Sequence, residues 1–304
     1  MPNAIPLPPP ALPRLPGLIV ASLAATWLIW GSTYLAIKWA LVSFPPFFQM
    51  GTRFVAAGLI LLGWSRWRGS AWPSRAQWVN ALVLGALMLG GGYGATALAQ
   101  TSVSSGLVVA FIAVVPALVA LAQWPYGVRP SWLETVGIAL GLFGVLLLTR
   151  GQGFAGSGPG LLAMAVACLT WSLGSVWALH GLPGGRPLTL ATGAMGYGSQ
   201  MFAGGGVLLA ASALVGEQPT WPPDGWALAS WVYLVVAGSL IAFCAYMVLL
   251  QRTSSVLASS YSFVNPLIAL VLGVTLDGEV VSSLEWIAAA VVLLGVLLLL
   301  AGRR

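Results

Sequence analysis

Ten apolar runs follow one another along the chain and are separated by short polar breaks. The breaks gather proline, glycine and charged residues, as between Arg66 and Ser74 or between Glu217 and Gly225. Because a helix needs about 20 apolar residues to cross a bilayer, each run predicts one membrane-spanning helix. The runs cover residues 17–37, 45–65, 76–98, 102–124, 131–149, 159–179, 188–214, 226–249, 255–275 and 282–301.

The composition is that of a chain whose solvent is lipid. Of the 304 residues, 59% are hydrophobic and 6% are charged, and the mean hydropathy is +0.95. Soluble domains carry roughly 25% charged residues, so a soluble protein is excluded. The formal net charge of +6 does not indicate a nucleic-acid partner, because the basic residues lie at the ends of the runs.

These basic residues are distributed unequally between the two sides of the predicted membrane. If the N-terminus is cytoplasmic, only Lys38 and Arg150 fall outside. Loops rich in lysine and arginine stay in the cytoplasm, so both termini are predicted to be cytoplasmic. The proline-rich start of the chain lacks the pattern of a signal peptide. The predicted inside segments hold Arg14, Arg66, Arg68, Arg75, Arg129, Arg186, Arg252, Arg303 and Arg304.

The second half of the chain repeats the first. Residues 127–148 align without a gap with residues 278–299, and Glu134 falls on Glu285. Spans 1–5 therefore correspond to spans 6–10, and since five is odd, the second half enters the membrane upside down. The predicted fold is an all-α integral membrane protein of ten helices, arranged as two inverted five-helix repeats around a central cavity. Its predicted parts are a disordered cytoplasmic tail (1–16), an N-terminal repeat (17–150) and a C-terminal repeat (159–304).

The motifs of enzymes and pumps are missing from the sequence. It has no His-Glu-x-x-His, no Gly-x-Ser-x-Gly and no phosphate-binding loop. Cys168 and Cys244 lie inside apolar runs, and His180 is the single histidine, so no metal site or cofactor is expected. Glycines such as Gly137 and Gly141 are spaced for close helix packing, either within the fold or between protomers.

Three residues inside the runs are of types that are costly in a membrane-spanning helix: one arginine and two prolines. Arg53 is the one basic residue well inside a span, and burying it unpaired is costly. It either faces the permeation path, where it can attract a substrate carboxylate, or bonds to a neighbouring helix. Pro116 and Pro266 occupy matching depths in spans 4 and 9, where a proline kinks a helix, so they are candidate hinges.

Polar and aromatic side chains deep in the spans are candidates for the lining of the central cavity. A serine in a span either faces the interior or bonds to its own helix backbone, and both readings stay open. No carboxylate lies at depth, which favours facilitated export, or weak proton coupling through an interfacial group, over an acidic relay. The candidates are Trp27, Trp30, Thr33, Tyr34, Tyr93, Ser105, Phe111, Trp171, Ser175, Tyr246, Ser260, Tyr261 and Asn265.

With these residues in view, the chain resembles the EamA-type, ten-span branch of the drug/metabolite transporter superfamily. Within that branch it is most similar to the YddG-type amino acid exporters. It departs from the pattern at Gly127-Val128, where the family often has Gly-Glu, so a symmetric role for that glutamate is not implied. The resemblance rests on Trp30-Gly31-Ser32, Arg53-Phe54, Pro116, Pro266, Gly278-Glu279, Gly144 and Gly295.

The resemblance implies alternating access of a central cavity to small metabolites. Aromatic and other neutral amino acids are the implied substrates, and the aromatic candidates suit them. The alternative is a multidrug or other-metabolite exporter of the same superfamily, and a membrane-embedded enzyme is the alternative from another class. We expect an inner (plasma) membrane protein without nucleic-acid partners, whose partners are the lipid bilayer and a small-molecule substrate. Its oligomeric state is left open between monomer and homodimer.

Overall fold

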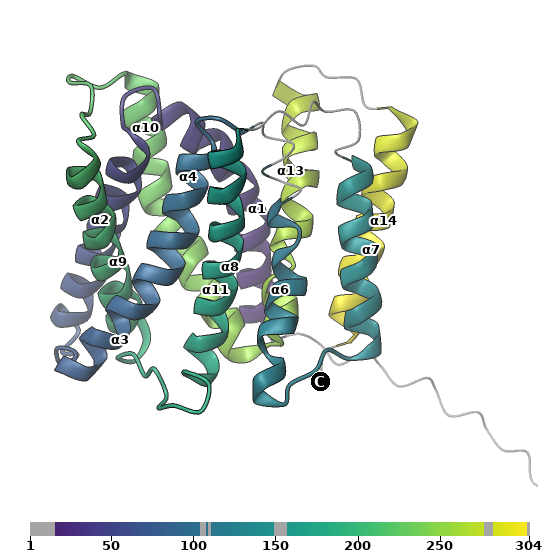
Figure 1. Ribbon diagram of the computed structural model, residues 1–304, viewed down its shortest axis with the longest axis horizontal. Coiled ribbons are helices and arrows are strands. Elements are labelled where there is room, and N and C mark those ends of the chain that lie inside the picture. Colours follow the sequence, from purple (N-terminus) through teal and green to yellow (C-terminus); the bar gives the residue numbers. More distant parts are fainter. Residues whose placement is uncertain (1–15, 104–107, 109–110, 149–156, 277–281, 303–304) are drawn as a thin grey trace, which may run out of the picture.

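The computed structural model describes the chain except residues 1–15, 104–107, 109–110, 149–156, 277–281 and 303–304. Its regular elements are helices that run roughly side by side (Figure 1). In chain order they are α1 Gly17–Ala40, α2 Pro46–Trp67, α3 Arg75–Gly85, η1 Ala86–Gly94, α4 Ala95–Ala99, α6 Val115–Ala122, η2 Trp124–Tyr126, α7 Trp132–Leu148, α8 Gly158–His180, α9 Gly193–Val215, α10 Gly225–Tyr233, η3 Leu234–Phe243, α11 Cys244–Arg252, α12 Ser255–Ala258, α13 Tyr261–Leu276 and α14 Ser283–Ala301.

Most of the predicted spans are continuous helices of membrane length. Among the described residues, seven helices are long and apolar enough to cross a bilayer. Helix α7 is a shorter apolar helix, and α6 and α13 occupy the two remaining runs. The structure thus confirms an all-helical membrane protein, and the count of ten spans stays a prediction.

The third and eighth runs each contain a π-helical segment, which the sequence analysis did not predict. Segment η1 continues α3 into α4, and η3 continues α10 into α11. A π-helical stretch inside an α-helix often marks a functional site. Both segments face the centre of the molecule, because η1 packs on α8 and η3 packs on α1.

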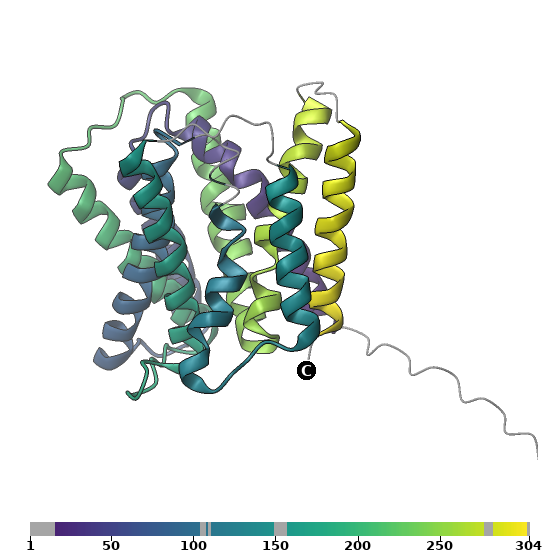
Figure 2. The same ribbon diagram turned by 45° about the vertical axis from the view of Figure 1, so that its right-hand side comes forward.

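Helices from the two halves of the chain pack against each other in two tight pairs. Helix α2 packs on α9 at one end of the molecule, and α7 packs on α14 at the other (Figures 1 and 2). Helices α1 and α8 lie between these pairs (Figure 1). Each of them packs mainly on the other half of the chain. Helix α1 of the first half contacts η3 and α13 of the second, and α8 of the second half contacts η1 and α6 of the first.

Glycines permit the close approach in both pairs. A Cβ atom on Gly58 of α2 would lie 2.6 Å from the Phe202 nitrogen of α9. A Cβ on Gly295 of α14 would lie 2.9 Å from the Gly137 oxygen of α7 and 2.7 Å from the Gly141 nitrogen. The Gly137-x-x-x-Gly141 spacing therefore serves packing within the fold.

The two predicted hinge prolines lie in different local structures. Pro116 stands in the first turn of α6, after a turn at Ala113 and Val114, where the missing N–H costs no helical hydrogen bond. Pro266 lies inside α13, so it interrupts the hydrogen-bond pattern of that helix. The expectation of a proline inside a helix is thus wrong for Pro116, whereas Pro266 does lie inside one. A kink at either position stays a prediction. A hinge role for either proline stays a prediction.

Candidate functional site

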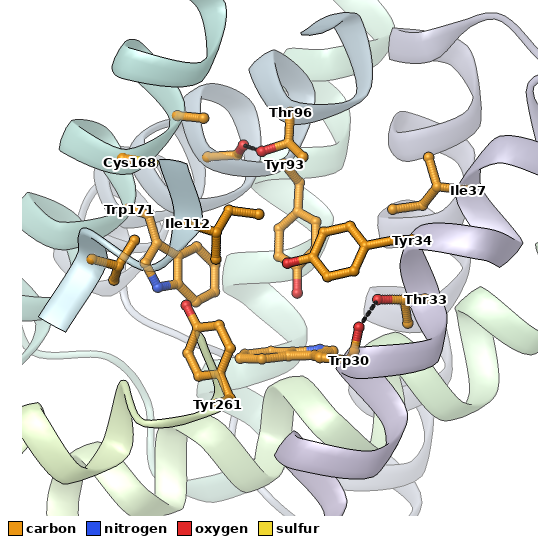
Figure 3. A pocket seen from close by; sticks show the side chains of 13 residues that line it. Trp30, Thr33, Tyr34, Ile37, Tyr93, Thr96, Ile112, Cys168, Trp171 and Tyr261 are labelled. Atoms are coloured by element: carbon orange, nitrogen blue, oxygen red, sulfur yellow. Dashed lines mark hydrogen bonds between the residues drawn. The ribbon is translucent and has the colours of Figure 1, made fainter. Parts of the chain in front are cut away.

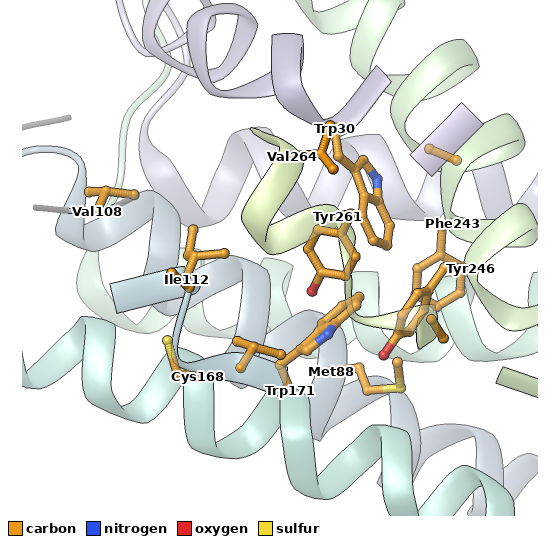
Figure 4. Packing of buried hydrophobic residues seen from close by; sticks show 14 of the residues in the cluster. Trp30, Met88, Val108, Ile112, Cys168, Trp171, Phe243, Tyr246, Tyr261 and Val264 are labelled. Atoms are coloured by element: carbon orange, nitrogen blue, oxygen red, sulfur yellow. The ribbon is translucent and has the colours of Figure 1, made fainter. Parts of the chain in front are cut away.

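Trp30 lies at the centre of a cluster of aromatic rings in the middle of the molecule. Its ring centroid is 4.6 Å from that of Tyr261, 5.3 Å from that of Tyr246 and 5.6 Å from that of Trp171. Tyr93 joins the cluster at 5.4 Å from Trp171. Most of these pairs meet edge to face, the arrangement that the ring quadrupoles favour. Figure 4 shows Trp30, Trp171, Tyr246 and Tyr261 gathered in the core.

A small cavity borders this cluster. Its volume is about 60 Å³, far below the roughly 300–1,000 Å³ of pockets that hold drug-sized ligands. The wall is therefore contracted around the space, and a ligand larger than a few water molecules has to displace side chains. The lining residues are Trp30, Thr33, Tyr34, Ile37, Gly92, Tyr93, Thr96, Ile112, Val115, Ala167, Cys168, Trp171 and Tyr261 (Figure 3).

The wall carries several polar atoms. The Trp30 indole N–H donates to the Gly238 carbonyl oxygen at 3.3 Å, which fixes that ring. The Asn265 side-chain amide donates to the Tyr34 hydroxyl at 3.4 Å. At the wall, Trp171 Nε1 makes no hydrogen bond in the structure, and directly behind it neither does Asn265 Oδ1. Buried polar atoms are usually paired, so these are available to a ligand.

Six of the thirteen candidates from the sequence line the cavity. Tyr246 and Asn265 stand directly behind them and touch lining residues. The side chains of Trp27 and Ser260 bond to each other at 3.0 Å outside the lining. The six lining candidates are Trp30, Thr33, Tyr34, Tyr93, Trp171 and Tyr261.

The other candidates lie elsewhere. Ser175 bonds to the Tyr246 hydroxyl and to the Trp171 carbonyl oxygen, both at 2.7 Å. Phe111 packs against the core, and its neighbour Ile112 takes the place in the lining. Ser105 lies outside the described residues.

Several lining residues were missed by the sequence analysis, although helical spacing contained a signal for some of them. Ile37 follows Trp30 by seven residues, and Cys168 precedes Trp171 by three, so each shares a helix face with a predicted residue. Thr96 follows Tyr93 by three in the same way. No such signal marked Ile112 and Val115, which flank the turn before α6.

A second, larger cavity lies where several of the membrane-spanning helices begin or end. Its volume is about 440 Å³. Arg129, Glu134 and Arg252 give its wall charged side chains, which the lining of the first cavity lacks, and His180 also contributes to this wall. It is bordered by the C-terminal ends of α8 and α11 and by the start of α12. We refer to it as the vestibule.

Neither cavity shows the residues of a metal centre. In the part of the chain that the structure describes, no three His, Cys, Asp or Glu side chains lie together. The smaller cavity offers aromatic faces, hydroxyls and unpaired hydrogen-bonding atoms, which can enclose a small molecule. A cavity between apolar membrane helices, together with a larger, charged vestibule near the helix ends, is consistent with a membrane transporter.

Comparisons with known proteins give the family. The chain belongs to the EamA-like transporter family, whose model matches residues 15–150 and again residues 158–301. It is 36% identical over 286 residues to the uncharacterized inner membrane transporter YedA of Escherichia coli, covering 94% of this chain and 91% of YedA. It is 27% identical to an uncharacterized transporter of Synechocystis, over 91% of this chain and 88% of that protein.

The solved structures show the same fold. One crystal structure superposes with a TM-score of 0.72 over 93% of this chain and 96% of that chain, at 21% identity. The family and its relatives are transporters, which confirms the prediction of a transporter over that of a membrane-embedded enzyme. The resemblance to the drug/metabolite transporter superfamily is confirmed as well.

Proposed function

We propose that this chain is an inner-membrane exporter of small metabolites, foremost aromatic and other neutral amino acids, as in the YddG-type branch. The aromatic cavity carries the proposal. Trp30, Trp171 and Tyr261 provide ring edges and faces for an apolar side chain, and Tyr34 offers a hydroxyl. Trp171 Nε1 can donate to a carboxylate, and Asn265 Oδ1 can accept from an ammonium group.

The proposed mechanism is alternating access between two inverted halves. The predicted orientation, with both termini cytoplasmic, makes the vestibule the cytoplasmic entrance, because it borders the predicted inside residues Arg129 and Arg252. Along α8, Trp171 lies at the cavity, Ser175 lies one turn further and Leu179 lies at the vestibule. The hydrogen bond between the Ser175 and Tyr246 hydroxyls therefore lies in the layer between the two spaces, where it acts as an inner gate.

The test is counterflow of labelled tryptophan into liposomes that hold the purified protein and unlabelled tryptophan. Saturable exchange without a proton gradient, which leucine or phenylalanine inhibits, is the expected result. Trp171→Phe removes the unpaired N–H while keeping a ring, so it should weaken apparent tryptophan affinity. Trp226→Phe is the matched control, because Trp226 is 74% exposed at the start of α10.

Two results would count against the proposal. Absence of exchange for every neutral amino acid, with and without a proton gradient, would remove amino acids as substrates. Equal effects of the two tryptophan variants would remove Trp171 from the binding site. Hydrophobic cations are the second candidate substrates, because ring faces attract cations, so a lipophilic quaternary ammonium dye belongs in the same panel.

A further inference from the structure

Arg53 is a cation buried at the centre of the molecule. It lies in the middle of α2, and its side chain is 0% exposed, the largest among the fully buried side chains of the described residues. Helix α2 contacts η3 here, so the guanidinium group lies between the two halves of the chain. A charge at this depth in a membrane protein marks a functional site by default.

The groups around the Arg53 guanidinium are neutral. Its Nε donates to the Ser239 hydroxyl at 2.8 Å, and its Nη1 points to the Met50 sulfur at 3.6 Å. Its Cζ lies 4.8 Å from the Phe54 ring centroid and 5.1 Å from that of Tyr93. Nη2 makes no hydrogen bond in the structure. The Tyr93 hydroxyl is the other polar group close to the guanidinium. Ring faces and a hydroxyl compensate a buried cation only in part.

The carboxylates of the described residues are engaged elsewhere. Glu217 accepts from the backbone N–H groups of Phe47 and Phe48 at the start of α2. Asp224 accepts from backbone N–H groups at the start of α10. Glu134 and Glu285 do the same at the starts of α7 and α14. None of these four carboxylates bonds to Arg53.

The unpaired Arg53 nitrogen lies directly behind the cavity wall. A Cβ atom built on Gly238 would lie 2.6 Å from Arg53 Nη2 and 3.3 Å from Thr33 Cγ2, and Thr33 lines the cavity. The carbonyl of Gly238 also accepts the Trp30 indole N–H. The Tyr93 ring is near both the guanidinium and the cavity wall: its centroid lies 5.1 Å from Arg53 Cζ and 5.4 Å from the Trp171 ring centroid.

Packing alone does not require a charge at this position. Gly51-Thr52-Arg53 of the first half resembles Gly198-Ser199-Gln200 of the second, so Gln200 of α9 corresponds to Arg53. It is also 0% exposed, and its amide points to the Met88 sulfur at 3.3 Å. A neutral side chain therefore fills the corresponding place in the second half. Packing alone does not explain why the first half has a charged one.

We propose that Arg53 forms an anion subsite of the transport cavity. When the Tyr93 ring turns aside, Nη2 binds the carboxylate of the substrate through a charge-assisted hydrogen bond, while the rest of the substrate occupies the aromatic cavity. This inference rests on the proposed function and makes it narrower. The substrates carry a carboxylate next to an apolar body, and hydrophobic cations without an anionic group are excluded.

The test compares indole probes that differ in charge. Tryptophan and indole-3-propionate carry the carboxylate, whereas tryptophanamide and tryptamine do not. The readouts are the thermal shift of the purified protein and inhibition of tryptophan counterflow. The wild type should bind the two acids about tenfold or more tightly than their neutral or cationic analogues, because one charge-assisted hydrogen bond is lost.

Two variants and a matched control isolate the charge. Arg53→Gln copies the residue of the second half and should abolish the preference for acids while leaving the yield of monodisperse protein. If Arg53→Gln does not fold, Gly238→Ala serves instead, because its Cβ displaces Nη2 and keeps the charge. Arg66→Gln makes the same change at the exposed end of α2 and should leave the preference unchanged.

The outcomes separate this inference from the proposed function. Loss of acid preference in Arg53→Gln, but not in Arg66→Gln, supports the subsite. A wild type that binds acids and amides equally, or an Arg53→Gln protein that still prefers acids, overturns it even if amino acids are transported. If the wild type prefers acids in the thermal shift but exchanges no amino acid, the subsite is supported and the proposed function is overturned.

Discussion

The tight pairing of α2 with α9 predicts opposite effects for one substitution at two positions of the same helix. Gly58 faces α9, and a Cβ there would lie 2.6 Å from the Phe202 nitrogen and 2.9 Å from the Gly198 oxygen. Gly63, five residues later, is exposed and has no atom within 4 Å of its Cβ position. Gly58→Ala should therefore destabilise the protein, whereas Gly63→Ala should stabilise it.

Two contributions set the change in the free energy of unfolding of each variant. Alanine in place of glycine inside a helix stabilises it by about 1 kcal/mol, and both variants gain this. Only Gly58→Ala forces two backbones apart, and such overpacking costs about 1–3 kcal/mol. The contacting atoms belong to the backbone, so a rotamer change cannot relieve the clash. The free energies of unfolding of the two variants should thus differ by about 1–3 kcal/mol.

The measurement is reversible unfolding of both variants and the wild type in mixed micelles, followed by tryptophan fluorescence as the fraction of denaturing detergent rises. The expected order of stability is Gly63→Ala, then wild type, then Gly58→Ala. A Gly58→Ala protein as stable as Gly63→Ala would refute the reasoning, because the two helices would then not approach as closely as the structure shows.

Two further substitutions test side-chain contacts between helices, one between the halves and one within the second half. Glu217→Ala removes the carboxylate that accepts the N–H groups of Phe47 and Phe48, and should cost about 1–2 kcal/mol in the same unfolding assay, as loss of a helix cap does; unchanged stability would contradict the contact. Tyr246→Phe removes the hydroxyl bonded to Ser175 and should cost about 1 kcal/mol, because Ser175 keeps its bond to the Trp171 carbonyl. A loss above about 3 kcal/mol would show that Ser175 is left unpaired.

Much of the fold could be predicted from the sequence, because a bilayer imposes strong constraints on a chain. Backbone groups in lipid must bond within their own helix, so apolar runs such as 17–37 and 159–179 can only be helices. The glycine spacing at Gly137 and Gly141 likewise predicted close packing, since small residues let membrane helices approach. Both conclusions depend only on neighbours along the chain.

Which residues line the cavity depended on the tertiary structure. Trp27 and Trp30 are equally apolar and three residues apart, yet Trp30 lines the cavity while Trp27 bonds to Ser260 beside it. The rotation of α1 against α13 and η3 decides between them, and helical periodicity does not report that rotation. Ile112 and Val115 line the cavity without any signal in the sequence, because the packing of the turn before α6 decides their place.

The surroundings of Arg53 show most clearly what the sequence determined and what only the tertiary structure decided. By itself the sequence determined that one arginine lies inside a span, where burial is costly because lipid and protein solvate a charge poorly. Only the tertiary structure decided that its partners are Ser239 and two aromatic rings, and that one nitrogen is left unpaired beside Gly238. Ser239 lies 186 residues from Arg53 along the chain, and packing between the halves brings them together.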